Sequence, residues 1–290
     1  MHSGRIALAA IAFALALPSQ TVAEDCALSP TGNGAVFFHP DGTLAGHRDA
    51  MRLVYCGPVG NSNWDRMPRM AAYRGHLTDQ LSGTSSAGAS IHATGTPTWS
   101  GSFGQDESGA KLRAADGLER IAANPRGFFA VIEEEGSDNF CNQHNASGCL
   151  EALKRADDAI GRMLGFIERH PKTFVLMASD SNAGGMQINE VDDPDASVPE
   201  RDARSGAMLD GRDGTATLPF LSASDRNGKR FPFAIAWAVG DDVGSGVIAR
   251  AAGHNADGLL PGNTLVKTDV YRALYFQLFG KAIQPLPVPR

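Results

Sequence analysis

The sequence contains no CxxC pair, no run of basic residues and no internal repeat. The lack of a CxxC pair argues against a thiolate metal site, because such sites commonly use that spacing. The 26 Lys and Arg residues are outnumbered by 32 Asp and Glu residues, and the net charge is −6. A nucleic-acid backbone is therefore not an expected partner. Beyond Pro18, no apolar stretch approaches the length of about 20 residues that a membrane-spanning helix needs.

The amino-terminal residues have the pattern of an export signal. Arg5 precedes an apolar stretch from Ile6 to Pro18, and small residues follow before the acidic Glu24. This stretch is too short to cross a bilayer, so an uncleaved membrane anchor is the less favoured interpretation. We expect residues 1–23 to be a signal peptide, residues 24–290 to form a single α/β domain, and the mature protein to be periplasmic or secreted without a membrane anchor.

The four cysteines permit three pairings. Cys141 and Cys149 bracket a short loop, whereas Cys26 and Cys56 bracket the first expected strand and helix. Because an exported protein folds in an oxidising compartment, we predict these two local disulfide bonds. The alternative is that the cysteines are buried free thiols.

Three apolar runs, at residues 34–38, 127–132 and 173–178, have the length and composition of buried strands. Carboxylates follow each run closely, at Asp41, at Glu133 and Asp138, and at Asp180. Between the second and third runs, apolar residues at helical spacing indicate a helix over 146–167, which makes a βαβ unit and hence a parallel sheet. The carboxyl ends of parallel strands form a ligand crevice, so we expect the acids to meet in one site.

Later segments are less regular. A fourth apolar segment, 233–239, also ends in acids, at Asp241 and Asp242. Residues 189–214 are acidic, mixed with arginines and rich in Asp, Pro and Gly, and we expect an irregular surface excursion with solvated charges. Residues 268–279 have the pattern of a closing amphipathic helix.

Buried carboxylates are unfavourable unless they are paired, hydrogen-bonded or bound to a cation. Several acids at one sheet edge therefore indicate an oxygen-rich site for a divalent metal. Its candidate ligands are Asp41, Glu133, Asp138 and Asp180. The alternative is that these acids are helix N-caps and surface groups.

Residues 83–95 form a run of small and hydroxyl-bearing residues at the start of an expected helix. In one interpretation Thr84, Ser85 and Ser86 only cap and pack this helix. In the other, one of them presents an alcohol nucleophile beside a metal, and the helix N-terminus receives a phosphate.

The order of these motifs resembles that of the alkaline phosphatases. That family has an Asp-Gly turn after an early strand, a serine nucleophile motif leading to Thr-Gly, a Glu with an Asp five residues later, an Asp-Asp-Ala helix and an acid before Gly-Gly. The corresponding residues here are Asp41-Gly42, Ser85 to Gly95, Glu133 with Asp138, Asp157-Asp158-Ala159, and Asp180 before Gly184-Gly185. The resemblance spans most of the mature chain and implies a three-layer α/β sandwich with a mainly parallel central sheet.

The resemblance also implies functional residues. An ungapped count back from Gly95 places Ser85 on the nucleophile of the family. The implied metal ligands are Asp41 and Asp180 for an ion beside Ser85, Asp138 with Asn142 for a second ion, and Glu133 for a third ion or its waters.

The sequence departs from the family at several of these positions. Asn142, Ser181 and Gly240 stand where the zinc-binding histidines are expected, and Thr84 replaces the Asp before the nucleophile. With mainly oxygen ligands left, Mg, Ca or Mn is favoured over Zn. A shorter connector leaves no counterpart for the phosphate-binding arginine of the family. The candidate substitute metal ligands are His39, His92, His144 and His254.

The resemblance implies metal-dependent hydrolysis of small phosphate monoesters through a phosphoseryl intermediate. Two alternatives stay open. One is a degenerate binding protein that keeps the fold and has lost turnover, because fold does not establish function. The other is an enzyme of the same superfamily that hydrolyses a phosphodiester or a sulfate ester.

Overall fold

The structure is a computed structural model that describes residues 32, 34–100, 127–244, 246–260 and 264–283. The expected signal peptide and Cys26 lie outside these ranges. Among the helices within them, none is both long and apolar enough to cross a membrane.

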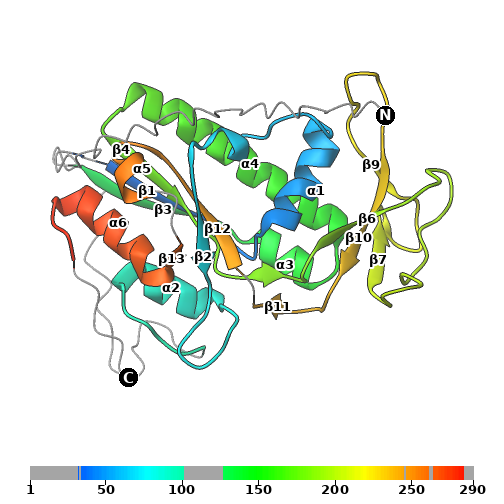
Figure 1. Cartoon of the computed structure of the whole chain (residues 1–290), viewed down its shortest axis with the longest axis horizontal. Coiled ribbons are helices and arrows are strands. Elements are labelled where there is room, and N and C mark those ends of the chain that lie inside the picture. Colours follow the sequence, from blue (N-terminus) through cyan, green and yellow to red (C-terminus); the bar gives the residue numbers. More distant parts are fainter. Residues whose placement is uncertain (1–31, 33, 101–126, 245, 261–263, 284–290) are drawn as a thin grey trace, which may run out of the picture.

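A six-stranded sheet forms the centre of the molecule (Figure 1). Its strands, in spatial order, are β13 (Leu265–Val266), β2 (Arg69–Arg74), β12 (Gly246–Gly253), β4 (Thr173–Met177), β1 (Gly34–Pro40) and β3 (Phe128–Glu134). Strand β1 pairs in parallel with β3 and β4, and β13 pairs in parallel with β2, whereas β12 is antiparallel to both neighbours. The sheet is therefore mainly parallel, as expected, and β12 is the strand that runs against the others.

Helices cover both faces of this sheet. Alternate residues of β1 point to opposite faces, so Val36 and Phe38 pack with α4 (Ala146–Arg169), whereas Ala35 and Phe37 pack with α6 (Lys267–Phe279). Helix α1 (Ala45–Cys56) packs beside α4, and α2 (Ser85–Thr94) packs beside α6. Short α5 (Ala256–Leu259) joins the α6 side. The expected three layers are present, and the closing helix is α6.

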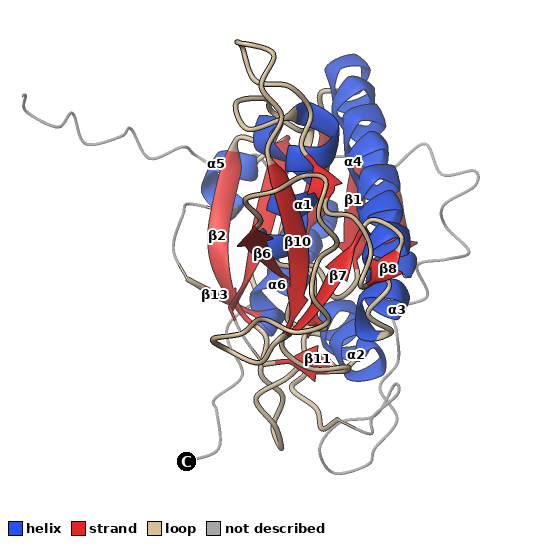
Figure 2. Ribbon diagram, turned by 90° about the vertical axis from the view of Figure 1, so that its right-hand side faces the viewer, coloured by secondary structure: helices blue, strands red, loops and turns tan. Residues whose placement is uncertain are grey.

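A second, antiparallel sheet lies at the end of the molecule that faces the viewer in Figure 2. It consists of β6 (Gln187–Glu190), β10 (Pro232–Trp237), β7 (Met208–Gly211) and β8 (Gly214–Thr215), with β9 (Phe220–Leu221) on β10. Phe233 and Ile235 of β10 pack in one cluster with Met51 of α1 and Leu150 of α4. The fourth apolar segment therefore belongs to this sheet and not to the central one.

The interpretation of residues 189–214 as an irregular excursion with solvated charges is wrong in part. The segment contains the end of β6 and the strand β7, and the side chain of Asp210 is buried. Asp210 accepts hydrogen bonds from Trp237 Nε1 at 3.3 Å and Thr215 Oγ1 at 3.1 Å. The strands are short and pair mainly with β10, which is distant in sequence, so local composition did not reveal them.

The disulfide bond between Cys141 and Cys149 is confirmed, with their Cα atoms 5.3 Å apart. It ties α3 (Gly136–Asn142) to the first turn of α4. Cys56 is a free thiol as far as the described residues go, and its predicted partner Cys26 lies outside them. The second bridge stays a prediction.

The Asp-Asp-Ala motif lies on α4, and its first aspartate has a structural role. Asp157 is buried, and its Oδ1 accepts the backbone N–H of Trp64 at 3.0 Å while its Oδ2 accepts Asn63 Nδ2 at 3.1 Å. These bonds hold the short helix η1 (Trp64–Arg66) against α4. The neighbouring Asp158 is exposed and pairs with Lys154 one turn earlier, at 2.6 Å.

We predict that Asp157→Ala lowers the free energy of unfolding by about 2 to 3 kcal/mol, because the buried backbone N–H of Trp64 and the half-buried amide of Asn63 lose a charged acceptor. Asp158→Ala is the matched control, with an expected change within about 0.5 kcal/mol for an exposed pair. Urea unfolding of both variants measures the difference. Equal stability of the two variants would contradict the structural role of Asp157.

Candidate active site

The loops that follow β1, β3 and β4 are held together by hydrogen bonds at one edge of the central sheet. The backbone N–H of Asp41 donates to Glu134 O at 3.2 Å, and Ser137 Oγ donates to Asp41 O at 2.7 Å. The backbone N–H of Thr43 donates to Ser179 Oγ at 2.8 Å. The three loops therefore place their side chains in one region, as the parallel-sheet argument predicts.

The turn after Asp41 requires glycine. Gly42 has φ +62°, and a Cβ there would lie 2.5 Å from Ala183 Cβ and 2.7 Å from Asp138 Oδ1. No larger residue fits between the loops without displacing them. The Asp-Gly dipeptide thus allows Asp41 and Asp138 to approach each other.

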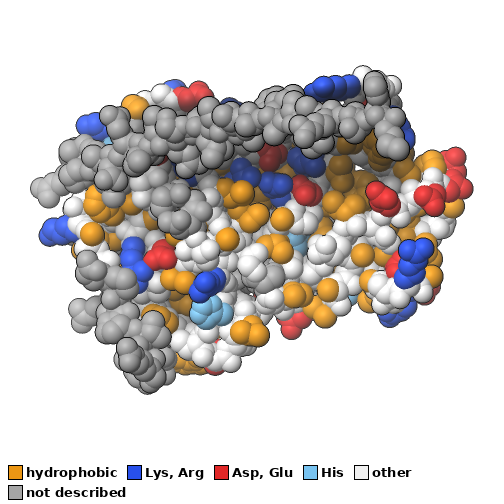
Figure 3. Space-filling view, in the orientation of Figure 1, with side chains coloured by type: hydrophobic (Ala, Val, Ile, Leu, Met, Phe, Trp, Pro, Cys, Tyr) orange, Lys and Arg blue, Asp and Glu red, His pale blue; other side chains and the backbone are white. Residues whose placement is uncertain are grey.

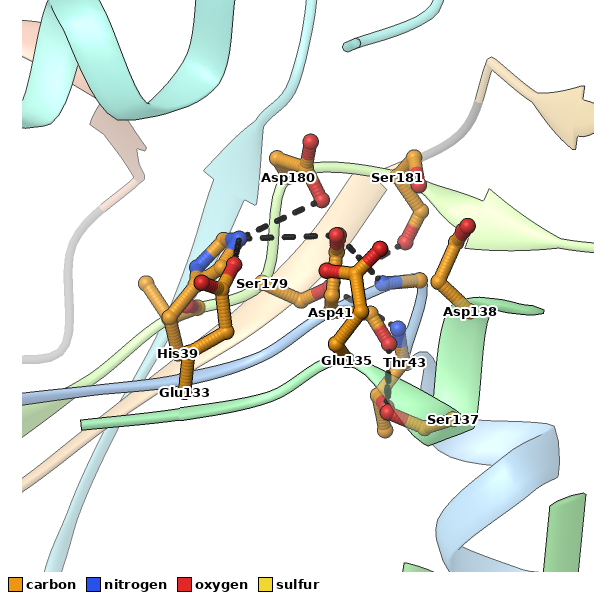
Figure 4. Close-up of polar contacts among 12 residues, drawn as sticks. His39, Asp41, Thr43, Glu133, Glu135, Ser137, Asp138, Ser179, Asp180 and Ser181 are labelled. Carbon is orange, nitrogen blue, oxygen red and sulfur yellow. Dashed lines mark hydrogen bonds and ion pairs between the residues drawn. The ribbon is translucent and has the colours of Figure 1, made fainter. Parts of the chain in front are cut away.

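The first group of site residues is centred on the His39 imidazole (Figure 4). Its Nε2 lies 3.5 Å from Asp41 Oδ1, 3.6 Å from Asp180 Oδ1 and 4.0 Å from Glu133 Oε1. Its Nδ1 is 2.8 Å from Ala178 O, which positions the ring. Asp41 and Asp180 are 0% and 1% exposed, whereas the Glu133 side chain is 46% exposed. The group therefore runs from the interior to the surface.

The second group surrounds Asp138 on α3. Asn142 Nδ2 donates to Asp138 Oδ1 at 3.0 Å and to Asp242 Oδ1 at 3.2 Å, and Asn142 Oδ1 accepts the backbone N–H of Gly184 at 2.8 Å. Asp242 reaches this position because β11 (Asp242–Val243) pairs with β5 (Asn182–Ala183), directly after Asp180. Carboxylate oxygens of Asp41, Glu135 and Asp138 also lie within 4.8 Å of one another.

The carboxylates raise one another's pKa. Burial, and then the charges of Asp242 and Asp41, raise the pKa of Asp138. Burial and the neighbouring Asp41 also raise the pKa of Asp180, and burial raises the pKa of Glu133. Crowded carboxylates resist ionisation, so a cation bound among them would stabilise their charged forms.

His39 is the histidine that joins this cluster. Burial lowers its pKa, but the Asp41 and Asp180 carboxylates outweigh burial and raise it to about 9. The His92 ring centroid lies 5.6 Å from that of His39, and its Nε2 is hydrogen-bonded to the Tyr73 hydroxyl. His144 Nε2 lies 2.8 Å from Val239 O, and His254 Nδ1 lies 3.1 Å from Gln277 Oε1. The structure thus brings one of the four candidate histidines to the carboxylates.

The site has atoms that suit a divalent cation. Both carboxylate oxygens of Asp180 and the Nε2 of His39 are buried and have no hydrogen-bond partner in the part of the chain that the structure describes. Unsatisfied buried oxygens beside further carboxylates are a ligand set for a hard metal ion. A separate grouping of His47 with Cys141 and Cys149 is not such a set, because the two thiols are bonded to each other.

The expected nucleophile segment lies against Asp180. Ser85 is the first residue of α2, and Thr84 is its N-cap. A Cβ at Gly83 would lie 2.3 Å from Asp180 O, and one at Gly88 would lie 2.9 Å from Asp180 Cβ. The start of α2 is therefore in contact with the carboxylate site. The side chains of Ser85 and Ser86 are outside the described structure, and the Thr84 hydroxyl donates to Ser100 O at 3.0 Å.

The structure brings together the five residues that the resemblance implies as metal ligands: Asp41, Glu133, Asp138, Asn142 and Asp180. It adds Glu135 and Asp242, which the sequence left unassigned. The acids after the fourth apolar segment were a signal for Asp242, but only the β5–β11 pairing shows where it lies. Figure 3 shows charged side chains of both signs scattered over one face, whereas the concentration of carboxylates is at the largely buried sheet edge.

No protein-family model and no curated protein sequence matches the chain. Solved structures of alkaline phosphatases do match most of it. The enzyme from Thermus thermophilus has a TM-score of 0.66 at 12% identity and covers 92% of this chain and 96% of its own. The cold-active enzyme from Shewanella sp. has a TM-score of 0.65 at 12% identity, and the match covers 84% of this chain and 99% of that enzyme. The enzyme from the Antarctic bacterium TAB5 has a TM-score of 0.64 at 11% identity, and the match covers 86% of this chain and 98% of that enzyme. Identities this low show the fold alone, so the chain has an alkaline phosphatase-like α/β fold.

Proposed function

We propose that this protein is an exported, metal-dependent hydrolase of small phosphate monoesters. The observation that carries the proposal is the contact between the start of α2 and Asp180, whose buried oxygens have no hydrogen-bond partner in the described chain. This contact puts a run of hydroxyl residues and a helix N-terminus next to carboxylates that we propose as ligands of a divalent cation. The alkaline phosphatase-like fold supports the same reaction class.

The ligands divide into two groups. Asp41 and Asp180, with His39 and Glu133, would hold one cation, and Asp138, with Asn142 and Asp242, would hold a second. Bound cations would stabilise charge on the attacking and leaving oxygens. The oxygen-rich second group favours Mg, Ca or Mn over Zn. A TAB5 alkaline phosphatase mutant has been solved with Mg bound in its M3 site.

Ser85 is the proposed nucleophile. Its hydroxyl would attack phosphorus while the bond to the ester oxygen breaks and the alcohol leaves. Water would then hydrolyse the phosphoseryl intermediate and release phosphate. The backbone N–H groups of the first turn of α2 would donate to the phosphoryl oxygens. We further propose that residues 24–290 act as one domain after removal of residues 1–23.

A second candidate is a binding protein of the same fold without turnover. One observation favours it: the His39 imidazole lies within 4.0 Å of three carboxylates and can itself supply positive charge among them. A cation would then be less necessary for a stable site.

We predict that the chelator-treated mature protein does not hydrolyse an aryl phosphate, and that Mg, Mn, Ca or Zn restores turnover. Asp180→Asn should lower kcat/KM by about 10²-fold or more, because it weakens a metal ligand. Asp158→Asn, on the exposed face of α4, should leave kcat/KM unchanged. Aryl phosphodiester and aryl sulfate substrates are assayed in parallel. Absence of turnover with every metal would favour the binding protein, and selective cleavage of the diester or sulfate would contradict the monoester assignment.

We predict that Ser85→Ala lowers turnover by about 10³-fold or more, because the covalent step is lost. Thr84→Ala and Ser86→Ala should mainly perturb helix capping and lower the free energy of unfolding by about 1 kcal/mol. Acid quenching with labelled substrate tests for a phosphoserine in each variant. If Thr84→Ala abolishes turnover while Ser85→Ala retains it, the threonine is the nucleophile. If none of the three hydroxyls matters, the phosphoseryl mechanism is wrong.

A further inference from the structure

Lys267, the first residue of α6, has a buried ammonium group. The residue is 3% exposed, and its Nζ has no hydrogen-bond partner in the described ranges. It forms none of the ion pairs found among those residues. Burying an ammonium without hydrogen bonds is strongly unfavourable, so the position of Lys267 indicates an acceptor that completes the site.

The Lys267 ammonium lies at the start of α2. A Cβ built on Gly83 would lie 2.6 Å from Lys267 Nζ and 2.3 Å from Asp180 O. Gly83 directly precedes Thr84, the N-cap of α2. The ammonium, the helix N-terminus and the backbone of Asp180 therefore meet around one glycine, which leaves room for the lysine because it has no side chain.

Two sources of positive potential coincide here. The N-terminus of a helix carries a partial positive charge, and its first N–H groups lack intrahelical acceptors. An ammonium next to such a terminus is unfavourable unless an anion lies between them. The charges of Asp180, Asp41 and Asp242 act on Lys267 from nearby, but among the described residues the lysine forms no ion pair or hydrogen bond with these carboxylates. Its ammonium therefore has donors left for an anion.

We propose that Lys267 is a phosphate-binding residue, whose ammonium donates to a non-bridging oxygen of a phosphoryl group seated at the N-terminus of α2. This inference rests on the proposed phosphate-ester hydrolysis. A lysine acts on a phosphate as a point charge with three donors, and it does not need the fixed fork of an arginine. The residue lies far in sequence from the hydroxyl run, and the packing of α2 on α6 brings the two together.

The test measures binding of inorganic phosphate to the metal-loaded mature protein by calorimetry. Lys267→Met removes the charge and keeps the length of the side chain. It should weaken phosphate binding by about 10- to 100-fold, the effect of losing a charged hydrogen bond. Lys154→Met, which removes a lysine from an exposed ion pair on α4, is the matched control and should bind phosphate like the wild type. Bound metal and thermal midpoint are measured for every variant.

The outcomes separate the inference from the proposed function. Phosphate affinity of Lys267→Met within about two-fold of the wild type overturns the inference, as does loss of bound metal together with phosphate. If Lys267→Met does not fold, Lys267→Gln replaces it, with the same expected direction. A wild-type protein that binds no phosphate also overturns the inference. Lys267-dependent phosphate binding without hydrolysis of any ester would support the inference and contradict the proposed function.

Discussion

The mutual repulsion of carboxylates at the carboxyl edge of the central sheet is the constraint on which the site depends. Asp41 and Asp180 are buried within ion-pair distance of the same imidazole, and Asp138 approaches Asp41 from α3. Asp41 raises the pKa of both Asp138 and Asp180, in addition to the effect of burial on each. In their ionised form, these buried carboxylates are stable only if positively charged groups lie next to them.

Several elements of the fold contribute positive charge to the site. The His39 imidazole comes from β1 itself, the Lys267 ammonium comes from α6, and the N-terminus of α2 lies between Lys267 and Asp180. Both carboxylate oxygens of Asp180 have no hydrogen-bond partner among the described residues. A divalent cation there would complete the charge balance, and a phosphate would then meet positive charge from the cation, the lysine and the helix. The elements that stabilise the carboxylates are therefore those that would bind the substrate.

Much of the fold and of the site could be predicted from the sequence, because short sequence patterns indicated the main strands, the long helix and most of the acidic residues of the site. The acids after three apolar runs indicated Asp41, Glu133, Asp138 and Asp180, since parallel strands end at one edge. The amphipathic pattern of α4 fixed its length closely. Asp242 could be seen as an acid but not placed, because its position depends on a two-residue strand pairing with β5. Lys267 gave no local signal, since it meets α2 only through helix packing. In the second sheet, β6 and β7 were missed because they pair with β10, which is remote from them in sequence.

The central claim, that the carboxylate cluster is a binding site for divalent cations, is tested most directly by titrating the chelator-treated mature protein with Mg, Mn, Ca and Zn in a calorimeter. The account predicts saturable binding of at least one of these ions. The binding should be lost or greatly weakened in Asp41→Asn, because Asp41 belongs to the first ligand group and its carboxylate also lies within 4.8 Å of that of Asp138 in the second. Circular dichroism establishes that each sample is folded. A folded wild-type protein that takes up none of the four ions, or an Asp41→Asn variant that binds them as tightly as the wild type, would contradict the account.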